Sequence, residues 1–167
     1  MTGAGRSCGC SIIAAIGKLK AGPERELFER YRERLTATGR ALGWGPVDII
    51  EIPESRAPDA ATRKSQEAER LLAKVGTAVK VILDENGREL TSQAFADYLR
   101  AQRQAGTGTL AFLIGGPDGH GQAMHSSADL KMSFGKMTLP HMLVRVLLAE
   151  QLYRAATILT GHPYHRN

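Results

Sequence analysis

The fold class of this chain is decided by the stretch Leu110-Ala111-Phe112-Leu113-Ile114-Gly115-Gly116-Pro117-Asp118-Gly119-His120-Gly121. The first half, Leu110–Ile114, is apolar at every position, as in a strand that is covered on both faces. The second half has four glycines in residues 115–121, so its backbone can adopt positive φ and approach a ligand closely. It matches neither the Gly-x-Gly-x-x-Gly pattern nor the Walker pattern. The stretch predicts a buried strand followed by either a ligand-contacting loop or a long surface turn.

Short apolar runs alternate with longer helical patterns along the rest of the chain. Pro23 begins one helical pattern, a second runs from an Asp59 cap towards Val75, and a third runs from Ser92 to Gly106. This alternation predicts an α/β fold with a mainly parallel sheet flanked by helices on both faces. The other predicted strands are Ser11–Ile16, Val47–Ile52, Ala78–Leu83 and a weaker Leu130–Phe134.

Two more segments follow predicted strands, at the sheet edge where open α/β folds bind ligands. The first is Leu83-Asp84-Glu85-Asn86-Gly87, whose Asn-Gly pair equally favours a plain turn. The second, residues 133–141, is Ser-Phe-Gly-Lys-Met-Thr-Leu-Pro-His, and the free amides of the helix that it precedes could hold a polar ligand. Lys136 in this segment could also be an ordinary solvated charge.

The last helical pattern begins at Pro140 and ends before Gly161. Its apolar residues occupy more than one face, so more than one face must be buried. One face can cover the sheet and another can meet a second subunit. The pattern therefore predicts a homodimer. These apolar residues are Met142, Leu143, Val144, Val146, Leu147, Leu148, Leu152, Tyr153, Ile158 and Leu159.

Composition is that of one ordinary globular domain. The 167 residues are 43% hydrophobic and 23% charged, and no apolar run approaches the roughly 20 residues of a membrane span. The N-terminal apolar run Ile12–Ile16 is too short for a secretory signal, so we expect a cytoplasmic protein. The net charge of +5 permits a polyanionic partner without requiring one.

The N-terminal segment and the histidines give little evidence of a metal. Residues 1–10 are small and polar, and we expect a disordered leader before a domain at 11–167. Cys8 and Cys10 form a lone Cys-x-Cys, so we expect incidental thiols. His162 and His165 lack helical i,i+4 spacing and have no acidic or Cys partner nearby, so no metal site is predicted.

Taken in order, these segments resemble the RlmH-type ribosomal RNA large-subunit pseudouridine N3-methyltransferases of the SPOUT superfamily. The resemblance extends from about Ser11 to Asn167. It is carried by Ile16-Gly17-Lys18-Leu19-Lys20, Leu83-Asp84, Ile114-Gly115-Gly116-Pro117-Asp118-Gly119, Lys136-Met137-Thr138-Leu139-Pro140-His141, Val144-Arg145-Val146, Glu150-Gln151-Leu152-Tyr153-Arg154-Ala155 and His162-Pro163-Tyr164-His165-Arg166.

The resemblance implies a single SPOUT-type domain with a C-terminal deep trefoil knot, an exception to unknotted topology. It also implies a homodimer whose RNA site is shared between subunits, and a bent S-adenosylmethionine cradled by the three loops. By matching motif, the implied cofactor-binding residues are Leu83, Gly115, Phe134, Gly135, Lys136, Met137, Thr138 and Leu139.

The implied reaction methylates N3 of a pseudouridine in helix 69 of 23S rRNA within the ribosome. The imide proton on N3 must leave, so a base or an anion-stabilising group is needed. Each candidate for this role could instead contact phosphate or pack against a helix, and the tail from His162 to Arg166 could line the RNA side of the site. Alternatives are a SPOUT enzyme acting on tRNA or on a ribose hydroxyl, and a non-catalytic ribosome-associated RNA-binding protein. The candidates are His141, Arg145, Tyr153, Arg154, Tyr164 and His165.

Overall fold

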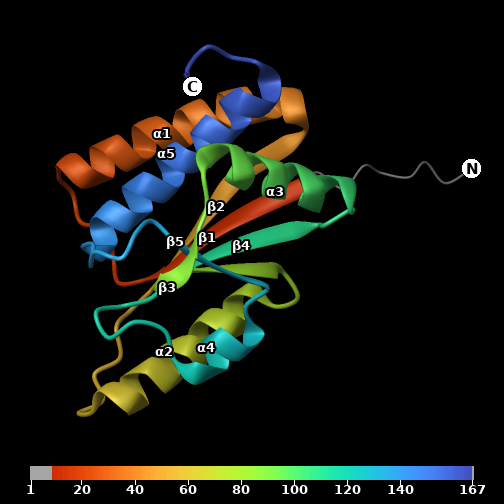
Figure 1. The fold of residues 1–167 in the computed structure, drawn as a ribbon. Helices are drawn as coiled ribbons and strands as arrows, with labels where there is room; N and C mark the ends of the chain where they lie inside the picture. Colours follow the sequence, from red (N-terminus) through yellow and green to blue (C-terminus); the bar gives the residue numbers. More distant parts are fainter. Residues whose placement is uncertain (1–8, 167) are drawn as a thin grey trace, which may run out of the picture.

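The computed structural model describes residues 9–166 and contains one five-stranded sheet in the order β2-β1-β4-β3-β5 (Figure 1). All paired strands of this sheet run parallel, which confirms the predicted α/β class. The strands are β1 (Gly9–Ile16), β2 (Trp44–Ile52), β3 (Val79–Glu89), β4 (Thr109–Ile114) and β5 (Leu130–Ser133).

Helices cover both faces of the sheet, as expected (Figure 1). One face packs against α1 (Pro23–Gly39), α3 (Ser92–Gln104) and α5 (His141–Thr160), and the other against α2 (Ala60–Val75) and α4 (Gln122–Ser127). A short 3-10 turn, η1 (Arg40–Leu42), follows α1. Among residues 9–166, no helix is long and apolar enough to cross a bilayer.

The apolar strands are explained by these two helical layers. In β4, Leu110, Phe112 and Ile114 belong to the core beneath α1, α3 and α5, whereas Ala111 and Leu113 belong to the core beneath α2. Successive side chains of a strand point to opposite faces, so a strand covered on both faces is apolar at every position.

Most helix boundaries follow their local signals. Pro23 is the first residue of α1, and the Asp59 carboxylate caps α2 by accepting a hydrogen bond from the Thr62 amide at 3.3 Å. Gly161 ends α5 at a φ of 73°. Pro140, expected as the first helical residue, instead precedes the helix as its cap, a shift of one position. Helix α4 and the turn η1 are too short to give a periodic signal and were not expected.

The strands β1 and β2 begin earlier than predicted. Gly9 and Cys10 were assigned to the leader, but both belong to β1, and β2 begins at Trp44. The Cys10 amide donates a hydrogen bond to the Gly108 carbonyl at 3.0 Å, and Gly9 lies opposite Trp44. Pairing with a neighbouring strand is a tertiary effect that local composition does not report. The rest of the leader, residues 1–8, lies outside the described residues.

The Asn86-Gly87 pair forms no chain-reversing turn, because β3 continues through it to Glu89. The pairing of β3 with β5 instead shifts register between Leu83 and Arg88, which is a bulge. At Gly87 the two backbones are so close that an added Cβ would lie 2.7 Å from the Lys131 carbonyl carbon and from the Met132 nitrogen. Glycine is therefore required here by close approach of the backbones.

We expect Gly87→Ala to lower the free energy of unfolding by about 1–3 kcal/mol, because the methyl group must push β5 away. Urea denaturation of both proteins measures the change. Gly108→Ala is the matched control, since its added Cβ meets no atom within 4 Å. An equal stability for Gly87→Ala and the wild type would show that β3 and β5 are not packed so tightly.

Candidate active site

A cleft of about 700 Å³ opens at the bulge of β3 and at the C-terminal ends of β4 and β5. It is lined by residues 83–86 of β3, residues 114–120 after β4, and most of residues 132–141 between β5 and α5, together with Val144. These are the three segments singled out from the sequence. The volume falls within the roughly 300–1,000 Å³ typical of small-molecule sites.

The loop after β4 makes a tight turn on the floor of the cleft. The Gly119 amide donates to the Gly116 carbonyl at 2.9 Å, and Gly119 has a φ of 82°. A Cβ added to Gly115 would lie 3.0 Å from the Gly119 carbonyl carbon. The loop is therefore a compact, ligand-facing turn, and glycine is needed where it folds back on itself.

The other two segments are joined directly across the cleft. The Thr138 hydroxyl donates to the Glu85 carboxylate at 3.1 Å, and the Ser133 hydroxyl lies 3.2 Å from the Glu85 carbonyl oxygen. Gly135, between them, has a φ of 132°, which an L-residue rarely adopts. The bulged end of β3 thus holds the linker that leads from β5 into α5.

The cleft has an acidic lining. The carboxylates of Asp84, Glu85 and Asp118 all line it. Asp84 lies 3.6 Å from His125 Nε2, and its other oxygen accepts a hydrogen bond from the Asn86 amide at 2.8 Å. Burial lowers the pKa of His120, whose Nε2 is 3.2 Å from the Leu113 carbonyl oxygen, so this imidazole stays neutral. Such a lining favours a ligand that carries positive charge.

All but one of the predicted cofactor-binding residues line this cleft. The exception is Lys136, which belongs to the same linker but is not among the lining residues. Asp84 and Glu85 belong to the segment 83–87 that was singled out but were not named as cofactor-binding residues, and Met132 lies within the predicted strand 130–134. The predicted residues found in the lining are Leu83, Gly115, Phe134, Gly135, Met137, Thr138 and Leu139.

The candidates for the proton-accepting role lie in different places. His141, the first residue of α5, lines the cleft. Arg145 is only 2% exposed, and its guanidinium donates to the carbonyls of Ile16 and Gly17 at 3.1 and 2.7 Å and to the Glu51 carboxylate at 2.8 Å. Arg145 therefore fastens α5 to the ends of β1 and β2.

The remaining candidates form a separate cluster between the C-terminal half of α5 and the tail that follows it. Arg154 and the Tyr164 hydroxyl both donate to the Glu150 carboxylate, the latter at 3.0 Å, and Arg154 lies over the Tyr164 ring. His165 Nδ1 is 3.3 Å from Arg154, and the Tyr153 ring centroid is 4.6 Å from that of Tyr164. Neither these four candidates nor Glu150 line the cleft of the same chain.

No metal-binding cluster accompanies the cleft. Within the described part of the chain, residues 9–166, no three His, Cys, Asp or Glu side chains converge as metal ligands would.

Comparison with known proteins assigns the family. Residues 11–165 match the family described as "Predicted SPOUT methyltransferase". The chain belongs to the SPOUT methyltransferase family. The match spans nearly every described residue, so the family expected from the motifs is confirmed and the chain is an S-adenosylmethionine-dependent methyltransferase.

The sequence similarity between this SPOUT chain and its relatives extends along almost the full length of both. "Ribosomal RNA large subunit methyltransferase H" of Xanthobacter autotrophicus is 51% identical over 156 residues, covering 93% of this chain and 98% of that protein. The protein of the same name from Bradyrhizobium sp. is also 51% identical, with 93% and 96% covered. A crystal structure of a probable methyltransferase from Bordetella pertussis shares the fold, with a TM-score of 0.52, 13% identity, and 90% and 98% covered.

The lining of the cleft suits the cofactor of the SPOUT family. S-adenosylmethionine combines an adenosine with a positively charged sulfonium, an ammonium group and a carboxylate, so its net charge is positive. Apolar side chains of Leu83, Ile114 and Leu139 can cover the adenine, while the carboxylates of Asp84 and Glu85 favour the positive charge. Backbone groups exposed by the glycines of residues 115–119 can bond the polar edges.

We expect Gly115→Val to abolish S-adenosylmethionine binding in a folded protein, because the branched side chain must displace the turn at Gly119. Titration calorimetry measures the affinity, and circular dichroism checks the fold. Gly108→Val, whose added Cβ meets no atom within 4 Å, is the control. Near-normal affinity in Gly115→Val would place the cofactor elsewhere.

Proposed function

We propose that this SPOUT methyltransferase modifies 23S ribosomal RNA, placing a methyl group on N3 of a pseudouridine in helix 69 of the ribosome. The observation that carries the substrate class is the 51% identity, over nearly the full length, to proteins named ribosomal RNA large subunit methyltransferase H. The net charge of +5 suits a polyanionic substrate. A substrate within the ribosome places the enzyme in the cytoplasm.

His141 is the proposed proton acceptor for this reaction. It lines the cleft that we assign to the cofactor, at the start of α5. The bound cofactor supplies an electrophilic methyl group, and N3 of the uracil ring must release its imide proton as the new bond forms. An imidazole can take up such a proton near neutral pH. Arg145 is unsuited to this role because its guanidinium is buried and bonded to Glu51.

We propose a homodimer that is formed through α1 and α5. These helices lie side by side (Figure 1). One leucine of α1 and two of α5 are exposed. Leu143 and Leu147 are one turn apart on α5 and are 42% and 38% exposed, and Leu27 on α1 is 37% exposed. A second copy would cover this apolar patch.

The tail is proposed to complete the partner's active site in this dimer. It contacts Glu150, which lies about 13 Å along α5 from His141 at 1.5 Å per residue. No residue of the tail lines its own chain's cleft, and we propose that the tail meets the cleft of a second copy docked at Leu143 and Leu147. We also propose that the linker 134–140 and α5 form the trefoil knot that the resemblance implies.

Incubation with the proposed substrate tests the function. Purified protein and S-adenosylmethionine should add one methyl group to a pseudouridine of helix 69 in ribosomes that lack this modification. Mass mapping of digested 23S rRNA locates it, and the Gly115→Val protein serves as the inactive control. A methyl group found on tRNA or on a ribose hydroxyl would reject the proposed substrate.

Mixed dimers test the shared site. Gly115→Val chains and chains lacking residues 164–167 should each be inactive alone, because one lacks a cofactor site and the other the tail. Random mixing makes half of the dimers mixed, each with one complete site, so about a quarter of wild-type activity should return. Light scattering should give twice the 18.1 kDa chain mass for both variants. A mixture that stays inactive would mean that the cleft and the tail do not cooperate between subunits.

A further inference from the structure

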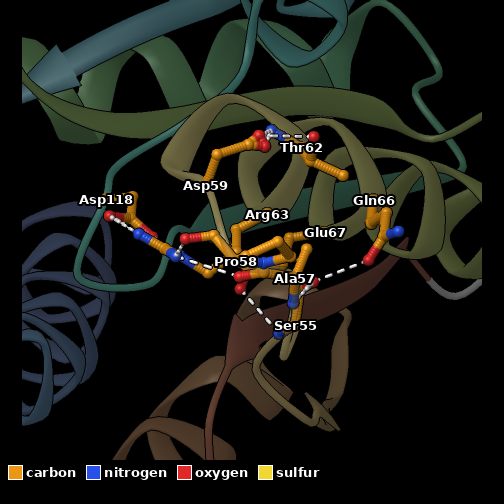
Figure 2. Close-up of polar contacts among 9 residues, drawn as sticks. All are labelled: Ser55, Ala57, Pro58, Asp59, Thr62, Arg63, Gln66, Glu67 and Asp118. Carbon is orange, nitrogen blue, oxygen red and sulfur yellow. Dashed lines mark hydrogen bonds and ion pairs between the residues drawn. The ribbon is translucent and has the colours of Figure 1, made fainter.

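Arg63 of α2 binds Asp118, which lies at the tip of the loop after β4. Its Nε and Nη2 donate to the two carboxylate oxygens of Asp118 at 2.7 and 3.1 Å, a bidentate pair (Figure 2). Its Nη1 donates to the carbonyls of Ala57 and Pro58 at 3.0 and 3.1 Å. All three guanidinium nitrogens are therefore used, and they join the loop to α2 and to the segment that precedes it.

The segment that precedes α2, whose carbonyls accept from Arg63, is itself held by hydrogen bonds. The Ser55 amide donates to the buried Glu67 carboxylate at 2.9 Å, and the Ser55 hydroxyl donates to the Gln66 side-chain oxygen at 2.6 Å (Figure 2). The Ala57 amide donates in turn to the Ser55 hydroxyl at 3.2 Å. Residues 55–58 and the first turns of α2 thus form one hydrogen-bonded unit from which Arg63 projects.

Glycines of the loop also allow it to pack closely against α2. A Cβ added to Gly116 would lie 3.2 Å from Glu67 Oε2 and 3.0 Å from Ile16 Cγ2, and one added to Gly121 would lie 2.9 Å from the Lys64 carbonyl oxygen. The tip between these glycines is less enclosed, since Pro117 and Gly119 are exposed. Arg63 supplies the contact that fixes this exposed tip.

We propose that Arg63 is a positioning residue for the cofactor: through Asp118 it keeps residues 115–121 in the conformation that binds S-adenosylmethionine. This inference rests on the proposed place of the cofactor in the cleft. Asp118 lines the cleft, whereas Arg63 does not, so Arg63 acts through the loop. The Arg63 hydrogen bond lowers the pKa of Asp118, so the pair stays ionised at any pH near neutrality.

Arg63→Gln tests the proposal. If the free loop occupies the binding conformation about a tenth of the time, the Kd for S-adenosylmethionine rises about tenfold. The kcat at saturating S-adenosylmethionine should stay near the wild-type value, because bound cofactor restores the conformation. Arg63→Lys keeps the charge but not the planar fork, so its Kd should lie between the two. Calorimetry gives Kd, and methylation of ribosomes gives kcat.

A double-mutant cycle shows whether Arg63 acts through Asp118. In the Asp118→Ala background, Arg63→Gln should cause no further rise in Kd, since the residue at 118 then has no side-chain acceptor for Arg63. Arg100→Gln is the matched control, because Arg100 pairs with Asp97 on α3 at 2.8 Å, away from the cleft. This variant should bind the cofactor like the wild type.

The outcomes separate this inference from the cofactor assignment. A wild-type Kd for Arg63→Gln, together with lost binding in Gly115→Val, would overturn the role of Arg63 alone. An equal rise in Kd for Arg63→Gln in both backgrounds, or a fall in kcat at saturating cofactor with Kd unchanged, would also overturn it. Normal binding in both Arg63→Gln and Gly115→Val would reject the cleft as the cofactor site.

Discussion

The parallel pairing of β4, β3 and β5 is the constraint on which the candidate site depends. Leu83 of β3 lies opposite Ile114 of β4 and also opposite Met132 of β5. The bulge of β3 and the ends of β4 and β5 therefore lie at the same level of the sheet. Parallel strands need long crossovers, so β4 and β5 both lead into connecting segments at this edge, next to the bulge. An antiparallel neighbour would have brought a strand start to this edge instead.

Arg145 is the second contact that fixes the structure at this edge of the sheet. A buried guanidinium is tolerated when it is paired and hydrogen-bonded, and here Glu51 and the carbonyls of Ile16 and Gly17 accept hydrogen bonds from its two terminal nitrogens. These bonds tie the start of α5 to the ends of β1 and β2. Since β5 lies at the other side of the sheet, the linker 134–140 must span the region between them. The cleft lies beneath this span.

The charge of the cleft differs from that of the whole chain. The chain is basic, with a net charge of +5, but Asp84, Glu85 and Asp118 line the cleft. The charge of Asp118 is balanced by its ion pair with Arg63, so the negative charge that the lining offers to a ligand comes from Asp84 and Glu85.

The sequence by itself determined the layers, the segments that line the cleft and the family. Fully apolar runs such as Leu110–Ile114 require cover on both faces, and glycines in residues 115–121 mark a backbone that folds tightly, so local chemistry sufficed for these. The family followed because an ordered set of motifs spans the chain. The ends of the helices were also predictable, since caps such as Asp59 act on their nearest neighbours.

Only the tertiary structure decided the extra residues of β1, the bulge at Gly87 and the roles of the arginines. Gly9 and Cys10 become strand because β2 and β4 lie beside them, and Asn86-Gly87 fails to turn because β5 continues to pair with β3. Arg63, Arg145 and Arg154 have the same side chain, but one holds a loop, one holds a helix and one holds the tail. An arginine's role is set by the acceptors within reach of its guanidinium, and those come from residues distant in the sequence.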